Sequence, residues 1–132
     1  MAGDAVVLDS GAISALAEGD SAILVALRKA LTAGASVLVP SVVLAESLTG
    51  DGRRDANLNR ALKSLAVRDL DEPIARAAAA LRHANRLRRA GTIDAIVVAT
   101  ADRVPGTRLI TTDPADLRPL AAVARRTVIV EI

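Results

Sequence analysis

Cysteine is absent from the 132 residues of this chain, and histidine occurs only once, as His83. The lack of cysteine excludes disulfide bonds and thiolate metal sites, and a single histidine excludes a multi-histidine zinc site. Any bound metal must therefore be held by oxygen atoms, which favours Mg²⁺ or Mn²⁺.

Aromatic residues are also absent, since the chain has no Phe, Tyr or Trp. A core must then be built from Ala, Val, Leu and Ile, and a bound nucleic acid cannot stack on aromatic rings. Hydrophobic residues make up 52% of the chain and charged residues 24%, which is typical of a folded globular protein. At this length we expect one domain spanning residues 1–132.

Long hydrophobic runs are missing as well. No run reaches membrane-spanning length, and no basic segment precedes the short apolar run near the N-terminus. We therefore expect a cytoplasmic protein with no membrane partner. Basic residues outnumber acidic ones by 17 to 15, and all but Lys29 and Lys63 are Arg, which grips phosphates through a planar fork. A GC-rich genome would produce the same Arg content.

Short apolar runs alternate with longer segments of helical spacing. The runs predict strands at Ala5–Leu8, Val37–Val39, Leu65–Leu70, Arg108–Ile110 and Val128–Val130. The longer segments predict helices at Ile13–Leu16, Ser21–Thr32, Ser41–Leu48, Asn57–Leu65, Pro73–Ala90, Thr92–Val104 and Pro114–Val123. The first, second and last runs are almost continuously apolar, which is typical of strands buried on both faces.

Glycines punctuate this pattern at the predicted helix ends. Gly34 and Gly91 occupy positions where helix C-caps are expected. The alternation as a whole predicts an α/β fold of three layers, with a mostly parallel central sheet of four to five strands and helices on both faces.

Two carboxylates follow predicted strands directly. Asp9 comes after AVVL, and Asp113 comes after RLITT. In an open parallel sheet, ligands bind beyond the carboxyl ends of the strands, where the strand order reverses. If the first and fourth strands are neighbours, these two carboxylates share one crevice. The alternative is that each is only a turn or N-cap residue.

Two further acids lie in apolar helical segments. Asp94 falls in TIDAIVVATA, which is apolar all round and should be buried, with Thr92 as the expected N-cap. A favourable helix dipole, about 1 kcal/mol or less, does not offset the several kcal/mol needed to bury a lone carboxylate. Asp94 therefore needs a cation, hydrogen bonds or a raised pKa. Glu46 is the only charge in PSVVLAESL, and an exposed helix face is the alternative for it.

These segments together resemble the PIN-domain family, and specifically its VapC-like branch of type II toxin–antitoxin toxins. VVLDSGA, PSVVLAES, TIDAIVVATA and LITTDPADL are similar, in order and spacing, to the four segments that carry the family's acids. One departure is Gly11, where the family more often has Ser or Ala. The resemblance covers essentially the whole chain and implies a PIN-like fold.

The resemblance implies a metal-dependent endoribonuclease that cleaves RNA with a metal-activated water. Its catalytic and metal-binding residues would be Asp9, Glu46, Asp94 and Asp113, with Mg²⁺ or Mn²⁺ as cofactor. Ser10, Thr111 and Thr112 would support the site with hydroxyl groups, and Asp116 is a nearby acid expected rather to cap the helix PADLRPL. The family also implies a homodimer and a cognate VapB-like antitoxin.

A basic stripe offers a surface for RNA. Within the predicted 74–90 helix, Arg82, Arg86 and Arg89 share one face at helical spacing and could follow an RNA backbone. A solvated surface is the alternative, and His83 is expected to be a surface residue. The basic loop Asp51–Arg54 is a further candidate contact with RNA or a partner.

Two other functional classes compete with the ribonuclease. A non-catalytic RNA- or protein-binding PIN domain usually lacks one or more acids, whereas all four are present here. A phosphotransfer domain fits poorly: a dehalogenase-like phosphatase needs a second Asp at position 11, which is Gly. A receiver needs a lysine late in the chain, and Lys63 is the last one.

Overall fold

The computed structural model describes residues 4–104, 106–124 and 128–132. Within these residues, five strands form one sheet in the order β3-β2-β1-β4-β5, and every neighbouring pair is parallel. The strands are β1 (Ala5–Leu8), β2 (Ser36–Pro40), β3 (Ala66–Arg68), β4 (Arg108–Thr111) and β5 (Val128–Glu131). The predicted α/β fold with a parallel central sheet is therefore confirmed.

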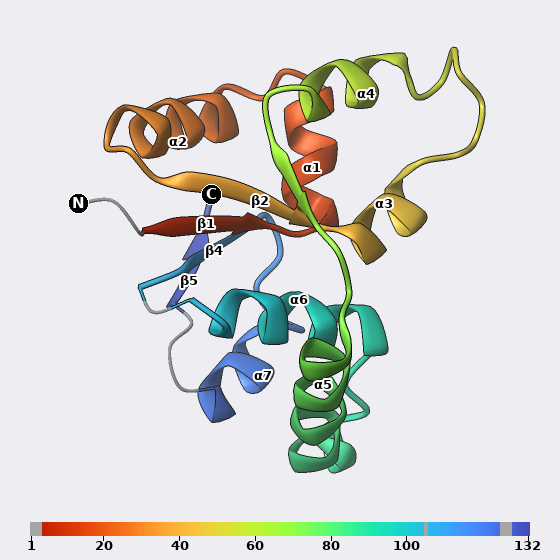
Figure 1. Ribbon diagram of the computed structural model, residues 1–132, viewed down its shortest axis with the longest axis vertical. Coiled ribbons are helices and arrows are strands. Elements are labelled where there is room, and N and C mark those ends of the chain that lie inside the picture. Colours follow the sequence, from red (N-terminus) through yellow and green to blue (C-terminus); the bar gives the residue numbers. More distant parts are fainter. Residues whose placement is uncertain (1–3, 105, 125–127) are drawn as a thin grey trace.

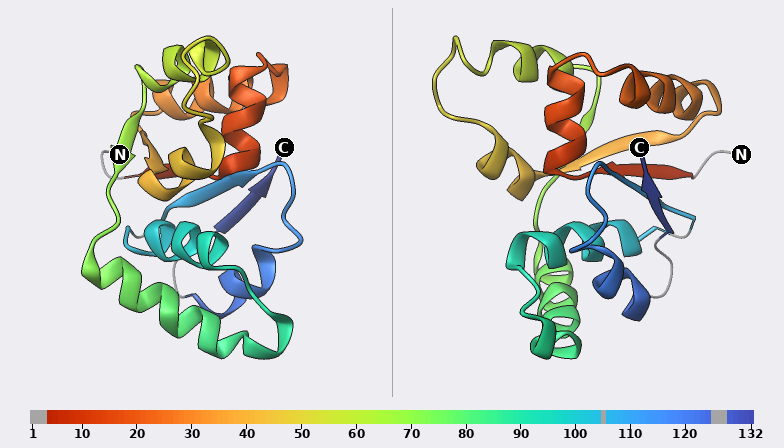
Figure 2. Two further views of the ribbon diagram at one scale, coloured as in Figure 1. Left: turned by 90° about the vertical axis from the view of Figure 1, so that its right-hand side faces the viewer. Right: turned by 180° about the vertical axis from the view of Figure 1, so that it is seen from behind.

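Helices cover both faces of the sheet, giving three layers (Figures 1 and 2). In Figure 1, α1, α2 and α4 lie above the sheet, whereas α5, α6 and α7 lie below it. The described helices are α1 (Ser10–Ala17), α2 (Ser21–Thr32), α3 (Ser41–Ser47), α4 (Ala56–Leu62), α5 (Glu72–Ala84), α6 (Thr92–Asp102), α7 (Arg118–Val123) and a short 3₁₀ turn, η1 (Arg86–Arg88).

The core is entirely aliphatic, as the composition requires. All four residues of β1 are buried, and so is the run Ala95–Ala101 in α6. Residues such as Leu8, Ile13 and Leu109 have no exposed surface. The prediction that the TIDAIVVATA helix is buried is confirmed, and this helix packs beneath the centre of the sheet.

Some predicted boundaries are wrong. The predicted helix Pro73–Ala90 ends at Ala84, because Asn85 leaves helical geometry and η1 follows. Gly34 has a positive φ of 85° just after α2, as expected, but Gly91 is the N-cap of α6 and ends no helix. Thr92 is therefore the first residue of α6 and not its cap.

The edge strands also differ from expectation. β5 was expected to be buried on both faces, but it lies at the edge of the sheet and Val128 is 56% exposed. The other edge strand, β3, covers only Ala66–Arg68 of the predicted Leu65–Leu70. A strand with one neighbour has less surface to bury, which an apolar run in the sequence does not reveal.

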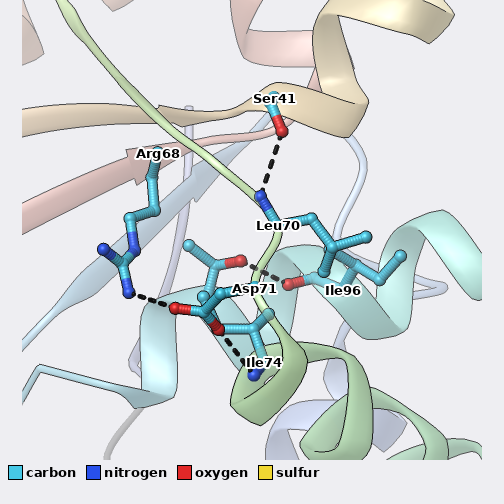
Figure 3. Close-up of polar contacts among 7 residues, drawn as sticks. Ser41, Arg68, Leu70, Asp71, Ile74 and Ile96 are labelled. Atoms are coloured by element: carbon cyan, nitrogen blue, oxygen red, sulfur yellow. Dashed lines mark hydrogen bonds and ion pairs between the residues drawn. The ribbon is translucent and has the colours of Figure 1, made fainter.

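The chain crosses from the upper to the lower helical layer between β3 and α5 (Figure 3). The Leu70 backbone N–H donates to the Ser41 hydroxyl at 3.2 Å, which ties the crossing to the first residue of α3. Asp71 accepts a hydrogen bond from the Ile74 N–H at 3.0 Å and pairs with Arg68 at 2.9 Å. This cap fixes the position at which α5 begins.

Within the described residues, no single helix is both long and apolar enough to span a membrane. The pair α1 and α2 meets those two criteria only when counted together, and a bend of 104° separates them.

Candidate acidic site at the carboxyl edge of the sheet

Asp9 is fixed by two elements at the carboxyl end of β1. The β1–β4 register pairs Leu8 with Ile110, which brings Asp9 beside Thr111. One carboxylate oxygen, Oδ1, accepts a hydrogen bond from the Ala12 N–H at 2.8 Å and so caps α1. The other, Oδ2, accepts from the Thr111 hydroxyl at 2.5 Å. Asp9 is therefore the N-cap of α1, which was the alternative interpretation of its position, and it also contacts β4 through Thr111.

The surroundings of Asp9 act on its pKa in opposite directions. Asp9 is only 8% exposed, and this burial raises the pKa above its ordinary value. The hydrogen bonds from Thr111 and Ala12 oppose the rise, and the charge of Glu46 adds to it. Burial is the largest of these effects.

Asp94 lies in the first turn of α6 and is half-buried. Burial raises its pKa most, followed by the charges of four acids, which are Asp116, Glu46, Asp9 and Asp113. Among the described residues, no group donates a hydrogen bond to this carboxylate. Asp94 thus differs from Asp9: its charge is surrounded by like charges and has no internal donor.

Glu46 and Asp113 are both exposed. Glu46 is near the end of α3, and Asp113 follows β4, where its N–H donates to the Thr111 hydroxyl at 3.0 Å. Both raise the pKa of Asp94, so the four acids chosen from the sequence interact electrostatically at one edge of the sheet. In the described part of the chain, however, no three Asp, Glu or His side chains are close enough together to hold a metal ion as they stand.

Asp116 is the acid that the sequence analysis placed wrongly. It was expected to cap the last helix, but α7 begins at Arg118, and Leu117 precedes it without a side-chain cap. The reason is a turn in which the Leu117 and Arg118 N–H groups donate to the Pro114 carbonyl. Among the charges that raise the pKa of Asp94, the charge of Asp116 has the largest effect. Pro119 is the signal that was overlooked, because proline favours the first turn of a helix.

Gly11 packs closely against the loop after β4. A Cβ atom at position 11 would collide with the Thr112 hydroxyl and would lie 3.6 Å from Asp9 Oδ1. The first turn of α1 therefore lies so close to this loop that position 11 has room only for glycine, unless the Thr112 side chain changes its rotamer. Ser10 follows Asp9 as the first residue of α1, and Thr112 follows β4 directly.

The predicted arginine stripe is formed by two elements and not by one helix. Arg82 lies in α5, Arg86 in η1, and Arg89 follows η1. All three are exposed and line one hollow of about 320 Å³, and His83 on its wall is exposed as expected.

The fold and site define an α/β protein with a parallel sheet and an acidic cluster where the strand order reverses. The sequence profile of the PIN domain family matches residues 6–124. This range includes the acids discussed above, which are Asp9, Glu46, Asp94, Asp113 and Asp116. The chain belongs to the PIN domain family.

Solved structures share this fold at low sequence identity. A structure of VapBC2 from Rickettsia felis, bound to a promoter DNA fragment, has a chain with a TM-score of 0.79 and 14% identity, covering 97% of this chain and 98% of its own. A chain of a DNA-bound VapBC from Salmonella typhimurium has a TM-score of 0.75 and 17% identity, and the match covers 98% of both chains. A chain of a toxin–antitoxin complex from Klebsiella pneumoniae has a TM-score of 0.66 and 24% identity, and the match covers 96% of this chain and 99% of the other. No curated protein sequence matches the chain significantly.

Proposed function

We propose that this protein is a metal-dependent endoribonuclease whose site is formed by Asp9, Glu46, Asp94 and Asp113. The observation that carries the proposal is the state of Asp94, which is half-buried among four other acids without an internal hydrogen-bond donor. A bound cation would stabilise the charged form of such a carboxylate by offsetting both its burial and the neighbouring negative charges.

The donor set fits a hard divalent cation. Carboxylate and hydroxyl oxygens are the side-chain donors near Asp9 and Asp94, which suits Mg²⁺ or Mn²⁺. We assign Asp9 and Asp94 as primary ligands, because the first is held by two hydrogen bonds and the second faces the other acids. Glu46 and Asp113 are exposed, and their side chains would turn inward to complete the set. When bound, the cation would supply Lewis-acid activation for phosphodiester hydrolysis.

The chain's own residues would prepare the site. Thr111 keeps one oxygen of Asp9 in place and receives the N–H of Asp113, so a single hydroxyl orders two of the acids. Ser10 and Thr112 offer hydroxyls beside this arrangement for a phosphate oxygen.

Cleavage of purified RNA tests the proposal. The protein should cut tRNA, rRNA or mRNA at a few positions with Mg²⁺ or Mn²⁺, and EDTA should stop the reaction. Asp9→Asn, Asp94→Asn and Asp113→Asn should each lower the rate by several orders of magnitude. Asp4→Asn is the matched control, because Asp4 lies at the opposite end of β1. No cleavage by a highly purified wild-type sample would favour the binding-domain alternative.

We further propose that the protein is a VapC-like toxin acting in the cytoplasm as a homodimer, with a VapB-like antitoxin. A groove of about 600 Å³ between α1, α2 and α4 supports a protein partner, and its lining combines Leu16, Leu24, Leu27 and Leu31 with polar residues that include Arg28 and Arg60. Leu24 and Leu31 are 43% and 51% exposed, and exposed apolar residues gathered in one groove with a polar rim are typical of protein–protein interaction sites. The neighbouring structures include toxin–antitoxin complexes.

Growth and sedimentation test this second part. Expression of the wild type alone should arrest a bacterial host, whereas Asp94→Asn at a matched protein level should not. Equal growth of the two strains would contradict the toxin assignment. Sedimentation at micromolar concentration should give a dimer, and a clean monomer near 13.6 kDa would contradict the dimer.

A further inference from the structure

Three arginines project from one short turn beside the acidic site. We call residues Arg86–Arg89 the arginine turn. It follows Asn85, which is buried and whose side-chain amide donates to the Leu81 carbonyl at 3.0 Å. The Arg88 N–H donates to the Asn85 carbonyl at 2.9 Å. The turn is thereby fixed to the end of α5.

Arg89 lies between two hollows of the surface. The first, of about 320 Å³, is lined by Arg82 and Arg86 and is called here the arginine hollow. The second, of about 460 Å³, is lined by Arg88, Asp94 and Asp116 and is called the acid cleft. Arg89 and Ala90 line both. The two hollows therefore adjoin at Arg89 and Ala90, with arginines on one side and Asp94 and Asp116 on the other, and together they are called the anion track.

The guanidinium groups of the turn are available to an anion. Between Pro73 and Ile93 the sequence contains no acid. Among the described residues, neither Arg88 nor Arg89 forms an ion pair, although Asp94 and Asp116 share the acid cleft with them. Arg86 is less available to an anion, because its guanidinium already donates a hydrogen bond to the His83 carbonyl at 2.9 Å. Arg88 and Arg89 therefore line the acid cleft together with Asp94 and form no ion pair among the described residues.

Both hollows are large enough to receive part of a flexible ligand. Each hollow falls in or near the range of about 300–1,000 Å³ that is usual for small ligands. Since the chain has no aromatic residue, bases cannot be held by stacking on aromatic rings, and the arginines that line the hollows suit the phosphates of the backbone.

We propose that Arg89 is a positioning residue that binds a phosphate of single-stranded RNA beside the one to be cleaved, with Arg88 and Arg82 on its two sides. The strand would run from the arginine hollow into the acid cleft. The identity of the ligand as RNA rests on the proposed ribonuclease function, but the anion track itself does not.

Binding without cleavage tests this proposal. Fluorescein-labelled octauridylate is titrated with the protein in EDTA, using Asp94→Asn as the background because it removes hydrolysis and weakens repulsion in the acid cleft. Adding Arg89→Gln should weaken binding roughly tenfold, as expected for the loss of one charge-assisted contact. It should also lower the slope of log Kd against log salt concentration by about 0.7, the value for one phosphate on a single strand.

Arg103→Gln is the matched control, because Arg103 is exposed and lies at the opposite end of α6 from Asp94. It should leave the affinity and the slope unchanged. Arg82→Gln and Arg88→Gln give second and third tests of the same track if Arg89→Gln unfolds, which circular dichroism would reveal. Each should lower the affinity for octauridylate.

Two outcomes would overturn the proposal, and a third would separate it from the ribonuclease function. Equal weakening by Arg89→Gln and Arg103→Gln would mean that only net charge matters. An unchanged affinity together with a changed sedimenting mass would make the arginine turn a contact between copies of the chain. Arg89-dependent binding by a protein whose wild type cleaves no RNA would support the track while contradicting the ribonuclease.

Discussion

The Thr111 hydroxyl donates to Asp9 Oδ2 at 2.5 Å, and the two residues are 102 positions apart in the sequence. This bond joins β4 to the start of α1 across the central strand pair. Thr111 is completely buried, and its oxygen also accepts from the Asp113 N–H. One hydroxyl thus connects the two acids that follow the central strands.

Thr111→Val should therefore weaken both the fold and the site. Removing a buried hydrogen bond to a charged group costs about 1.5–3 kcal/mol of unfolding free energy. The bond from Thr111 also lowers the pKa of Asp9, so its loss should raise that pKa further. Because a metal ligand must be deprotonated, the stabilisation by Mg²⁺ should then begin at a higher pH. Urea unfolding and the melting temperature with Mg²⁺ across pH would measure these effects.

Thr100→Val is the matched control for that prediction. Thr100 is also buried, and its hydroxyl donates to the Ile96 carbonyl at 2.7 Å, away from the acids. Thr100→Val should lower the unfolding free energy without changing the pH at which Mg²⁺ begins to stabilise the protein. If both variants move it equally, Thr111 has no special part in the site.

Asp94→Asn should stabilise the metal-free protein at pH 7. The pKa of Asp94 is raised, so the folded state holds this proton more tightly than the unfolded chain does. The stabilising protonated form is present below about pH 4 and is lost as the pH rises through the raised pKa. At pH 7 the charged carboxylate therefore destabilises the fold, and the amide removes that effect.

The check is the melting temperature in EDTA at pH 7 and near pH 4. A gain of a few degrees is expected at pH 7 and little or none near pH 4. Mg²⁺ should stabilise the wild type more than the variant. A gain of equal size at both pH values would show that the effect is not electrostatic, and Asp4→Asn serves as the reference for a simple change of charge.

Asp55→Asn should destabilise the loop that carries Arg53 and Arg54. The Asp55 carboxylate accepts hydrogen bonds from the Thr49 N–H at 2.9 Å, the Thr49 hydroxyl at 2.9 Å and the Gly50 N–H at 2.9 Å. These hydrogen bonds lower the pKa of Asp55, and the bond from the Thr49 N–H has the largest effect. The stability that Asp55 contributes is therefore present above about pH 4 and is lost as the pH falls through the lowered pKa.

Urea unfolding of Asp55→Asn at pH 7 should give a lower midpoint, and the difference from wild type should shrink in acid. Asp51→Asn is the control in the same loop, because Asp51 is exposed and accepts only from the Arg53 and Arg54 N–H groups. An Asp51→Asn effect as large as that of Asp55→Asn would contradict the special role of the buried carboxylate.

Arg89→Gly should raise stability while removing a guanidinium. Arg89 has φ 52° and ψ 46°, a left-handed conformation that disfavours residues with a Cβ by roughly 1–2 kcal/mol. Glycine adopts it freely, so the unfolding free energy should rise by about 1 kcal/mol. Arg88→Gly is the control, since Arg88 has no positive φ and glycine there should lower stability. A loss of stability in Arg89→Gly would contradict the strain at this position.

The parts of the fold that local pattern determines were predictable from the sequence. AVVL matches β1 residue for residue, and TIDAIVVATA is the buried helix α6. The neighbouring positions of Asp9 and Asp113 followed from the rule for parallel sheets, once β1 and β4 were taken as neighbours. The assignment of these acids to a metal stays a prediction.

The features that tertiary contacts determine were not predictable. The end of α5 at Asn85 has no strong signal, because the arginines after it are good helix formers. The approach of Asp116 to Asp94 depends on a turn whose carbonyl acceptor is Pro114. The edge position of β5 depends on strand order, which periodicity does not encode.

The central place of β1 also fixes when the site is completed during synthesis. β1 precedes the other four described strands in the sequence, but its second neighbour, β4, ends only at Thr111. Until β4 is made, one edge of β1 is open and Asp9 lacks its hydroxyl partner. Domains form from the N-terminus as the chain emerges, yet this fold cannot close around β1 early. A nascent chain would thus carry an incomplete acidic site until the residues of β4 have been synthesised.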